Sequence, residues 1–251
     1  AAVNLLREQG LRAPALPVSC GTDPRRFHPD ASVDRAQCRR RYGLDAERPL
    51  IISVGRVDRE KRLDILIRAM TYVENPDLRL GIVGEGAAAA ELKALVHNLN
   101  LEQRIHFTGR VPNEDLPVLL SSADAFAMAS EAELLSIASL EAMATGLPML
   151  LADAMALPEL VTPGENGYLF KPGDPREAAR AMDRLLRERD RWPQMGAASL
   201  ERAKAHSLEA TVERYASLYV QVLEEAPALQ GATATPPRNR GAEIAHRSGH
   251  P

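Results

Sequence analysis

The sequence has few cysteines and no long apolar run. Cys20 and Cys38 are the only cysteines among 251 residues, without a CxxC pair or a neighbouring histidine cluster, which disfavours a disulfide framework and a zinc site. No stretch approaches the roughly 18 to 20 apolar residues of a membrane span, and the N-terminus lacks the basic segment and apolar core of a signal peptide. We therefore expect a cytoplasmic protein with free thiols.

An excess of charge of one sign is also lacking. The formal net charge is -3, which disfavours a dedicated nucleic-acid binder. Lysine is scarce, with four residues among the 31 basic ones, so a lysine at a motif position is informative. For the cluster 39–41, three consecutive arginines, we favour a solvated helix face, while contact with phosphates or peripheral contact with an anionic membrane stays open.

The composition, 45% hydrophobic and 26% charged, is that of a globular protein, and the length suits one domain with appendages. Residues 1–48 are punctuated by proline and glycine and are predicted to be a connector with one short helix at 34–42. Residues 226–251 lack apolar periodicity, so we expect a disordered tail. The folded domain is expected at 49–225.

Within that domain, strand-like apolar runs alternate with segments of helical spacing. The predicted strands are 50–54, 78–83, 104–107, 125–128, 148–152 and, at the sheet edge, 167–170. The predicted helices are one from Lys61 onward, 87–99, 112–122 and 136–144, then helices alone over 174–225 with breaks near 192–193 and 206–207. This pattern predicts an α/β fold, a doubly wound parallel sheet with right-handed crossovers. Ligands then bind at the carboxyl ends of the strands, in the loops at Gly55, Gly84, Thr108 and Ala129.

Two pairs of charged residues lie at such strand ends. Arg56 follows the first strand and Lys61 begins the next helix, so both cations could converge on a diphosphate; ordinary surface charge is an equally good interpretation. Glu133 and Glu141 flank a strand-to-helix junction, where carboxylates could accept hydrogen bonds from sugar and ribose hydroxyls. Spacing alone favours solvent-facing glutamates, and Glu131 is a rival for the loop position.

Other motifs are weak or missing. The run Gly84-Glu85-Gly86 allows close backbone approach to a ligand but is not a full GxGxxG fingerprint. No GxxxxGK[ST], HExxH or GxSxG occurs, which disfavours a P-loop NTPase, a zincin and an α/β-hydrolase. The histidines stand on separate elements, and we interpret them as structural or solvated.

Five segments in order carry a family resemblance: 18–29 (VSCGTD, then FHP), 54–61 (VGR, then EK), 83–86 (VGEG), 107–109 (FTG) and 131–169 (EAELLSIASLEAMATGLP, then GENGYL). Together they resemble the C-terminal half of the retaining glycosyltransferases of family 4, also called glycosyl transferases group 1. The resemblance covers about 15–220. It implies the donor-binding, Rossmann-like half of a GT-B protein, in which two such domains face each other across a cleft.

The resemblance also implies roles for individual residues. It places Arg56 and Lys61 at the donor diphosphate, Glu133 at the hydroxyls of the transferred sugar and Glu141 at the nucleotide ribose. The catalytic set is Glu133, Arg56 and Lys61, and the donor-binding set adds Gly55, Gly84, Arg110, Val111, Leu134, Leu135, Ser136, Ile137 and Glu141. No metal or other cofactor is expected, because the two cations and a helix N-terminus stabilise the departing diphosphate.

The implied function is transfer of a hexose from a UDP- or GDP-sugar to a lipid, saccharide or small-molecule acceptor. Leu135-Ser136 replaces the family's aromatic-glycine pair, which alters backbone approach to the donor. The resemblance begins at the interdomain linker, so we expect 1–48 to be linker and remnant of the N-terminal half, and an N-terminal acceptor-binding domain to be the missing partner. Two alternatives stay open: a non-catalytic nucleotide-sugar-binding fragment that needs that partner, and a GT-B epimerase acting on UDP-sugars.

Overall fold

The computed structural model describes residues 1–230, in a compact unit Ala1–Glu213 and a second unit that starts at Arg214. The first unit contains a six-stranded parallel sheet with the strand order β3-β2-β1-β4-β5-β6. Its strands are β1 (Leu50–Val54), β2 (Arg79–Val83), β3 (Ile105–Gly109), β4 (Ala125–Met128), β5 (Met149–Ala152) and β6 (Gly167–Phe170). This order confirms the predicted doubly wound α/β fold and places β6 at an edge.

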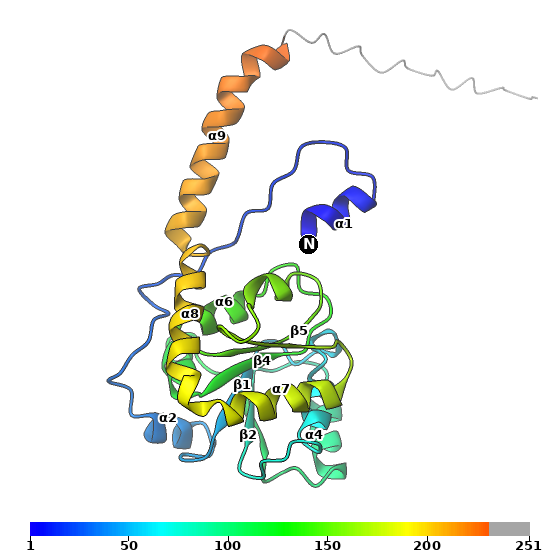
Figure 1. Ribbon diagram of the computed structural model, residues 1–251, viewed down its shortest axis with the longest axis vertical. Coiled ribbons are helices and arrows are strands. Elements are labelled where there is room, and N and C mark those ends of the chain that lie inside the picture. The colour runs from blue at the N-terminus through cyan, green and yellow to red at the C-terminus, as the bar shows by residue number, and fades with distance from the viewer. Residues whose placement is uncertain (231–251) are drawn as a thin grey trace, which may run out of the picture. The chain divides into compact units, whose positions relative to one another are not determined.

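Helices connect and cover the strands. They are α1 (Ala2–Glu8), α2 (Arg35–Arg41), α3 (Leu63–Ala69), α4 (Ala89–Asn98), α5 (Leu116–Ser122), α6 (Ile137–Ala144), α7 (Pro175–Arg187), α8 (Trp192–Lys204) and α9 (Leu208–Gln230), with 3-10 turns η1 (Arg59–Lys61), η2 (Leu157–Leu160) and η3 (Arg189–Arg191). The chain moves outward from β1 to β3 and then returns through β4 to β6, so right-handed connections put α3 and α4 on one face and α5 and α6 on the other. Figure 1 shows α6 and α7 on opposite sides of β4 and β5.

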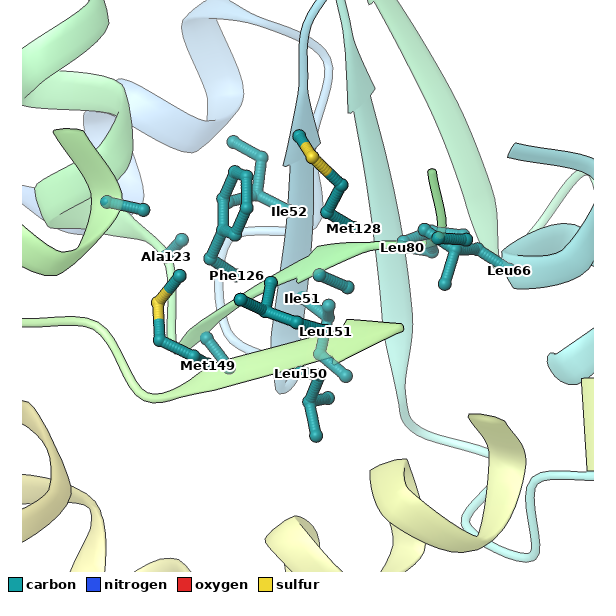
Figure 2. Close-up of a cluster of buried hydrophobic side chains, with 14 of the residues drawn as sticks. Ile51, Ile52, Leu66, Leu80, Ala123, Phe126, Met128, Met149, Leu150 and Leu151 are labelled. Atoms are coloured by element: carbon teal, nitrogen blue, oxygen red, sulfur yellow. The ribbon is translucent and has the colours of Figure 1, made fainter. Parts of the chain in front are cut away.

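The core lies between these layers and consists of the apolar runs that predicted the strands. Ile52 on β1 pairs with Phe126 on β4, both are fully buried, and Figure 2 shows their side chains together in the core. Because these central strands are covered on both faces, every residue in them is apolar or small. The burial of these side chains holds the carboxyl ends of β1 and β4 side by side.

Residues before β1 pack on this sheet. Phe27 and Leu44 are buried, and Asp34 caps α2 by accepting a hydrogen bond from the Gln37 amide, as the short predicted helix requires. The buried guanidinium of Arg39 donates to the Ser122 carbonyl and to Asp124, at the start of β4. Much of the expected connector is thus part of the first unit.

Three helix boundaries differ from the expectations. α5 begins at Leu116 rather than Pro112, with Pro117 in its first turn. The helix expected from Lys61 is interrupted, because Arg62 adopts a left-handed backbone (φ 48°) between η1 and α3. α9 continues to Gln230, so residues 226–230 are helical, and the disorder expected for 231–251 lies outside the described residues. Among the described helices, none is long and apolar enough to cross a membrane.

Candidate nucleotide-sugar site

The strand order reverses between β1 and β4, so the loops after these two strands diverge and leave a crevice at their carboxyl ends. A narrow hollow there is lined by residues from three neighbouring strand ends and from η1, among them Gly55, Arg56, Lys61, Val83 and Met128. Arg56 and Lys61, the residues predicted to bind the diphosphate, therefore lie where doubly wound folds bind their ligands.

Two glycines let the backbones of β1 and β2 meet at this edge. Gly55 and Gly84 have φ angles of 150° and 131°, which side chains rarely permit. A Cβ atom at Gly84 would lie 2.0 Å from the Gly55 carbonyl oxygen. The Gly55 amide donates to the Val83 carbonyl (3.0 Å) and the Gly84 amide to that of Gly109 (2.9 Å). The strand ends are thus closely joined, and Arg56 emerges from a rigid support.

Lys61 and Glu133 form the central contact of the site. The Lys61 Nζ donates to the Glu133 Oε1 at 2.7 Å, although the two residues are 72 positions apart. The Glu133 side chain is 10% exposed and that of Lys61 is 22% exposed, so water screens this pair only partly. The loop carrying Glu133 is held further by its carbonyl, which accepts a hydrogen bond from the Ala156 amide (3.1 Å).

Glu131, the rival for this position, points elsewhere. Its carboxylate pairs with Arg62, the residue with the left-handed backbone at the start of α3. The two glutamates therefore have different partners, Arg62 for Glu131 and Lys61 for Glu133, and only Glu133 contacts a cation of the predicted site.

Arg56 is 69% exposed and is held by two carboxylates. Its Nη1 lies 2.7 Å from the Asp58 Oδ2, and its Nη2 donates to the Glu60 Oε1 at 2.5 Å. The same Glu60 oxygen lies 3.6 Å from the Lys61 Nζ. Arg56 and Lys61 thus converge on one point, as two cations that bind a diphosphate must.

The N-terminus of α6 faces the same edge. Ser136 caps it, since its Oγ accepts a hydrogen bond from the Ser139 amide (3.2 Å) and lies 3.2 Å from the Met128 sulfur at the end of β4. The amides of Ile137 and Ala138 have no acceptor within the described part of the chain. Free amides and the helix dipole favour an anion at this end. The serine that replaces the family's glycine is therefore a helix cap.

Glu141 lies about one and a half turns into α6 and pairs with none of Arg56, Lys61 and Glu133. Within the described residues, its carboxylate has no hydrogen-bond or ion-pair partner. Burial raises the pKa of Glu141 to about 7, and the positive charge of Arg26, from the segment before α2, lowers it in part. A half-buried carboxylate without a partner is able to accept hydrogen bonds from a ligand.

The remaining predicted residues surround this edge. Arg110 is exposed and Val111 packs partly on the core just after β3, while Leu134 and Ile137 are 53% and 48% exposed beside Glu133. Leu135 packs against the core. Within the described part of the chain, no group of three or more His, Cys, Asp or Glu could hold a metal ion. The expectation that no metal is needed stays a prediction.

The contacts of Asp58, Glu60 and Arg26 were missed by sequence reasoning. The dipeptide Glu60-Lys61 belonged to the resemblance, but its spacing gave no sign that Glu60 binds both cations. Arg26 donates to the carbonyl of Asn113 and lies over the Phe27 ring. It reaches Glu141 only through tertiary folding, across 115 residues, so no local signal could have identified it.

The fold and this edge define a Rossmann-like α/β domain with converging cations at its switch point, the architecture of one half of a GT-B protein. A model of the family described as glycosyl transferases group 1 matches residues 34–202. The chain belongs to this family, which confirms the predicted membership.

Individual relatives agree with this assignment. The GDP-mannose-dependent alpha-(1-6)-phosphatidylinositol monomannoside mannosyltransferase of Mycolicibacterium smegmatis is 34% identical over 187 residues, 71% of this chain and 48% of that protein. Sucrose-phosphate synthase from Thermosynechococcus elongatus matches with TM-score 0.79 and 30% identity, over 89% of this chain and 56% of that one. An Anabaena protein solved with UDP-glucose shares the fold, with TM-score 0.79 and 24% identity over 87% and 61% of the two chains. The chain spans 37% to 50% of the length of its curated relatives.

Proposed function

We propose that this chain provides the donor site of a nucleotide-sugar-dependent retaining glycosyltransferase. The Lys61–Glu133 pair carries the proposal. It brings the residue predicted to bind the diphosphate into direct contact, at the switch point, with the residue predicted to bind the sugar. Names of the relatives support the ligand class, since GDP-mannose and UDP-glucose are both diphosphates of a nucleoside and a sugar.

Each group in the site has a defined role in this proposal. Arg56 and Lys61 bind the diphosphate, and the free amides at the start of α6 donate hydrogen bonds to its negatively charged oxygens. When the bond to the sugar breaks, negative charge develops on the departing diphosphate, and these fixed donors stabilise it without a metal ion. Glu133 binds hydroxyls of the transferred hexose, Glu141 binds the two ribose hydroxyls, and the backbone at Arg110 and Val111 lies by the base.

Transfer needs an acceptor as well as a donor. As the resemblance implies, the acceptor attacks from the face that the diphosphate leaves, so the sugar retains its anomeric configuration. We propose that a lipid, a saccharide or a small molecule is bound by a second domain across the cleft. Because the chain spans about half of its relatives, a second candidate function is donor binding alone, with transfer only when that domain is supplied.

Titration calorimetry with UDP- and GDP-sugars tests the donor site directly. Arg56→Ala and Lys61→Ala should each weaken binding by about 1.5 to 3 kcal/mol, roughly 10- to 150-fold, since each removes a charge-assisted contact. Arg59→Ala is the matched control, because Arg59 is 86% exposed and pairs with Glu91. Its affinity should stay near that of the wild type.

Two results would contradict the proposal. One is the absence of binding for every nucleotide sugar and nucleoside diphosphate tried. The other is unchanged affinity in both the Arg56 and the Lys61 variants. A transfer assay then separates the candidates: donor-dependent product from this chain alone would exclude the function limited to binding.

A further inference from the structure

The two cations of the site are surrounded by three carboxylates. Arg56 contacts Asp58 and Glu60, and Lys61 contacts Glu60 and Glu133. These five side chains carry one more negative charge than positive, although the site is expected to bind a diphosphate. An entering phosphate oxygen therefore competes with a carboxylate that already occupies the cations.

Two of the three carboxylates are anchored. The Asp58 Oδ1 accepts a hydrogen bond from the Ala87 amide (3.2 Å), while its Oδ2 faces Arg56. Glu133 is buried, with a side chain that is 10% exposed, and is held by Lys61. Moving Asp58 would break its hydrogen bond with the Ala87 amide, and the burial of Glu133 leaves its carboxylate little room to turn into solvent.

Glu60 is different. Its side chain is 50% exposed, and its carboxylate contacts Arg56 and Lys61 and no other group in the described part of the chain. Its backbone is fixed independently, because the Ser130 hydroxyl donates to the Glu60 carbonyl at 3.2 Å. The carboxylate can therefore turn into solvent without disturbing η1 or the loop after β4.

We propose that Glu60 is a built-in competitor of the donor diphosphate, a carboxylate that takes the phosphate position between Arg56 and Lys61 and is displaced on binding. This inference rests on the proposed donor site and assigns the role to a residue outside the set expected to bind the donor. Glu60 keeps the cations directed at one point, lowers diphosphate affinity and, by returning to them, speeds release of the nucleoside diphosphate.

The substitution Glu60→Gln separates competition from support, because it removes the charge and keeps the size of the side chain. Affinities for inorganic pyrophosphate, UDP and GDP should rise about two- to five-fold, the range of an exposed ion pair, and the gain should shrink at high salt. The control Glu91→Gln makes the same charge change on exposed Glu91, outside the site, and should leave affinity unchanged. In the Arg56→Ala background the gain from Glu60→Gln should be reduced, since one of the contested cations is absent.

The outcomes are distinct. Weaker or unchanged pyrophosphate binding in Glu60→Gln would overturn the inference, and weaker binding would mean that Glu60 supports the cations. An equal gain in Glu91→Gln would reduce the effect to net charge and would also overturn it. If pyrophosphate binds and Glu60→Gln tightens it while nucleotide sugars do not bind, the competitor role stands and the proposed function fails.

Discussion

Ionisation of Glu141 should make the stability of the fold depend on pH in a defined direction. Burial raises the pKa of Glu141 from its ordinary value near 4.5 to about 7 in the folded chain. The folded state then binds this proton more tightly than the unfolded state does. The stabilisation is fully present below pH 4.5 and is lost as the pH rises through 7.

The size of the effect follows from the shift. An unscreened change of this size corresponds to about 3 kcal/mol. Because the side chain of Glu141 is only partly buried, solvent screening reduces the expected loss to on the order of 1 to 2 kcal/mol. Glu141→Gln mimics the protonated form. The free energy of unfolding of the variant should therefore match that of the wild type at pH 5 and exceed it by that amount at pH 8.

Urea unfolding at pH 5 and pH 8 measures this difference. The change between the two pH values is compared for wild type and Glu141→Gln, with exposed Glu91→Gln as a control that should follow the wild type. The same wild-type-to-variant difference at both pH values would refute the reasoning. A wild type that gains stability over Glu141→Gln on going to pH 8 would show that the carboxylate has a partner in the folded chain.

Two further substitutions test the framework of the site by the midpoint of urea unfolding. Gly84→Ala should lower the free energy of unfolding by about 2 to 4 kcal/mol, because the φ of 131° and the Gly55 carbonyl leave no room for a Cβ. The control Gly164→Ala, where a Cβ would lie in open space, should lower it by about 1 kcal/mol. Equal losses in the two variants would contradict this. Arg39→Met should lower the free energy of unfolding by about 3 kcal/mol, because it removes a buried partner of Asp124. Arg35→Met changes a side chain that is 48% exposed and should lower it by less than about 1 kcal/mol. An equally small loss in Arg39→Met would argue against a buried ion pair.

The strands could be predicted because their signal is local. Short apolar runs such as 50–54 and 125–128 have no polar face, and parallel strands covered on both sides require that composition. The helix at 112–122 was predicted four residues too long at its start. Pro112 resembles a first-turn proline, but a helix from Pro112 would put Pro117 in its interior. Pro117 has no N–H to donate to the Asn113 carbonyl and its ring would clash there, so the helix begins at Leu116.

The sequence indicates a set of candidate site residues but not their contacts. The resemblance singles out Arg56, Lys61, Glu133 and Glu141, and three of these residues lie at the carboxyl ends of β1 and β4 or in the turns that follow. The choice between Glu131 and Glu133 stayed open in the sequence. It depends on which way one loop side chain points, and that direction is set by Lys61 and Arg62 on a distant element.

The sequence by itself therefore determined the alternation of strands and helices, the doubly wound sheet and the family, because each depends on apolar periodicity or on residues in a fixed order. Only the tertiary structure decided which charges meet. Glu60 contacts both Arg56 and Lys61, and Glu133 contacts Lys61. The charge of Arg26 lowers the pKa of Glu141 in part. Such contacts arise where strand ends from distant parts of the chain converge. Electrostatic interactions depend on the distance between charges in space, not on their separation in sequence.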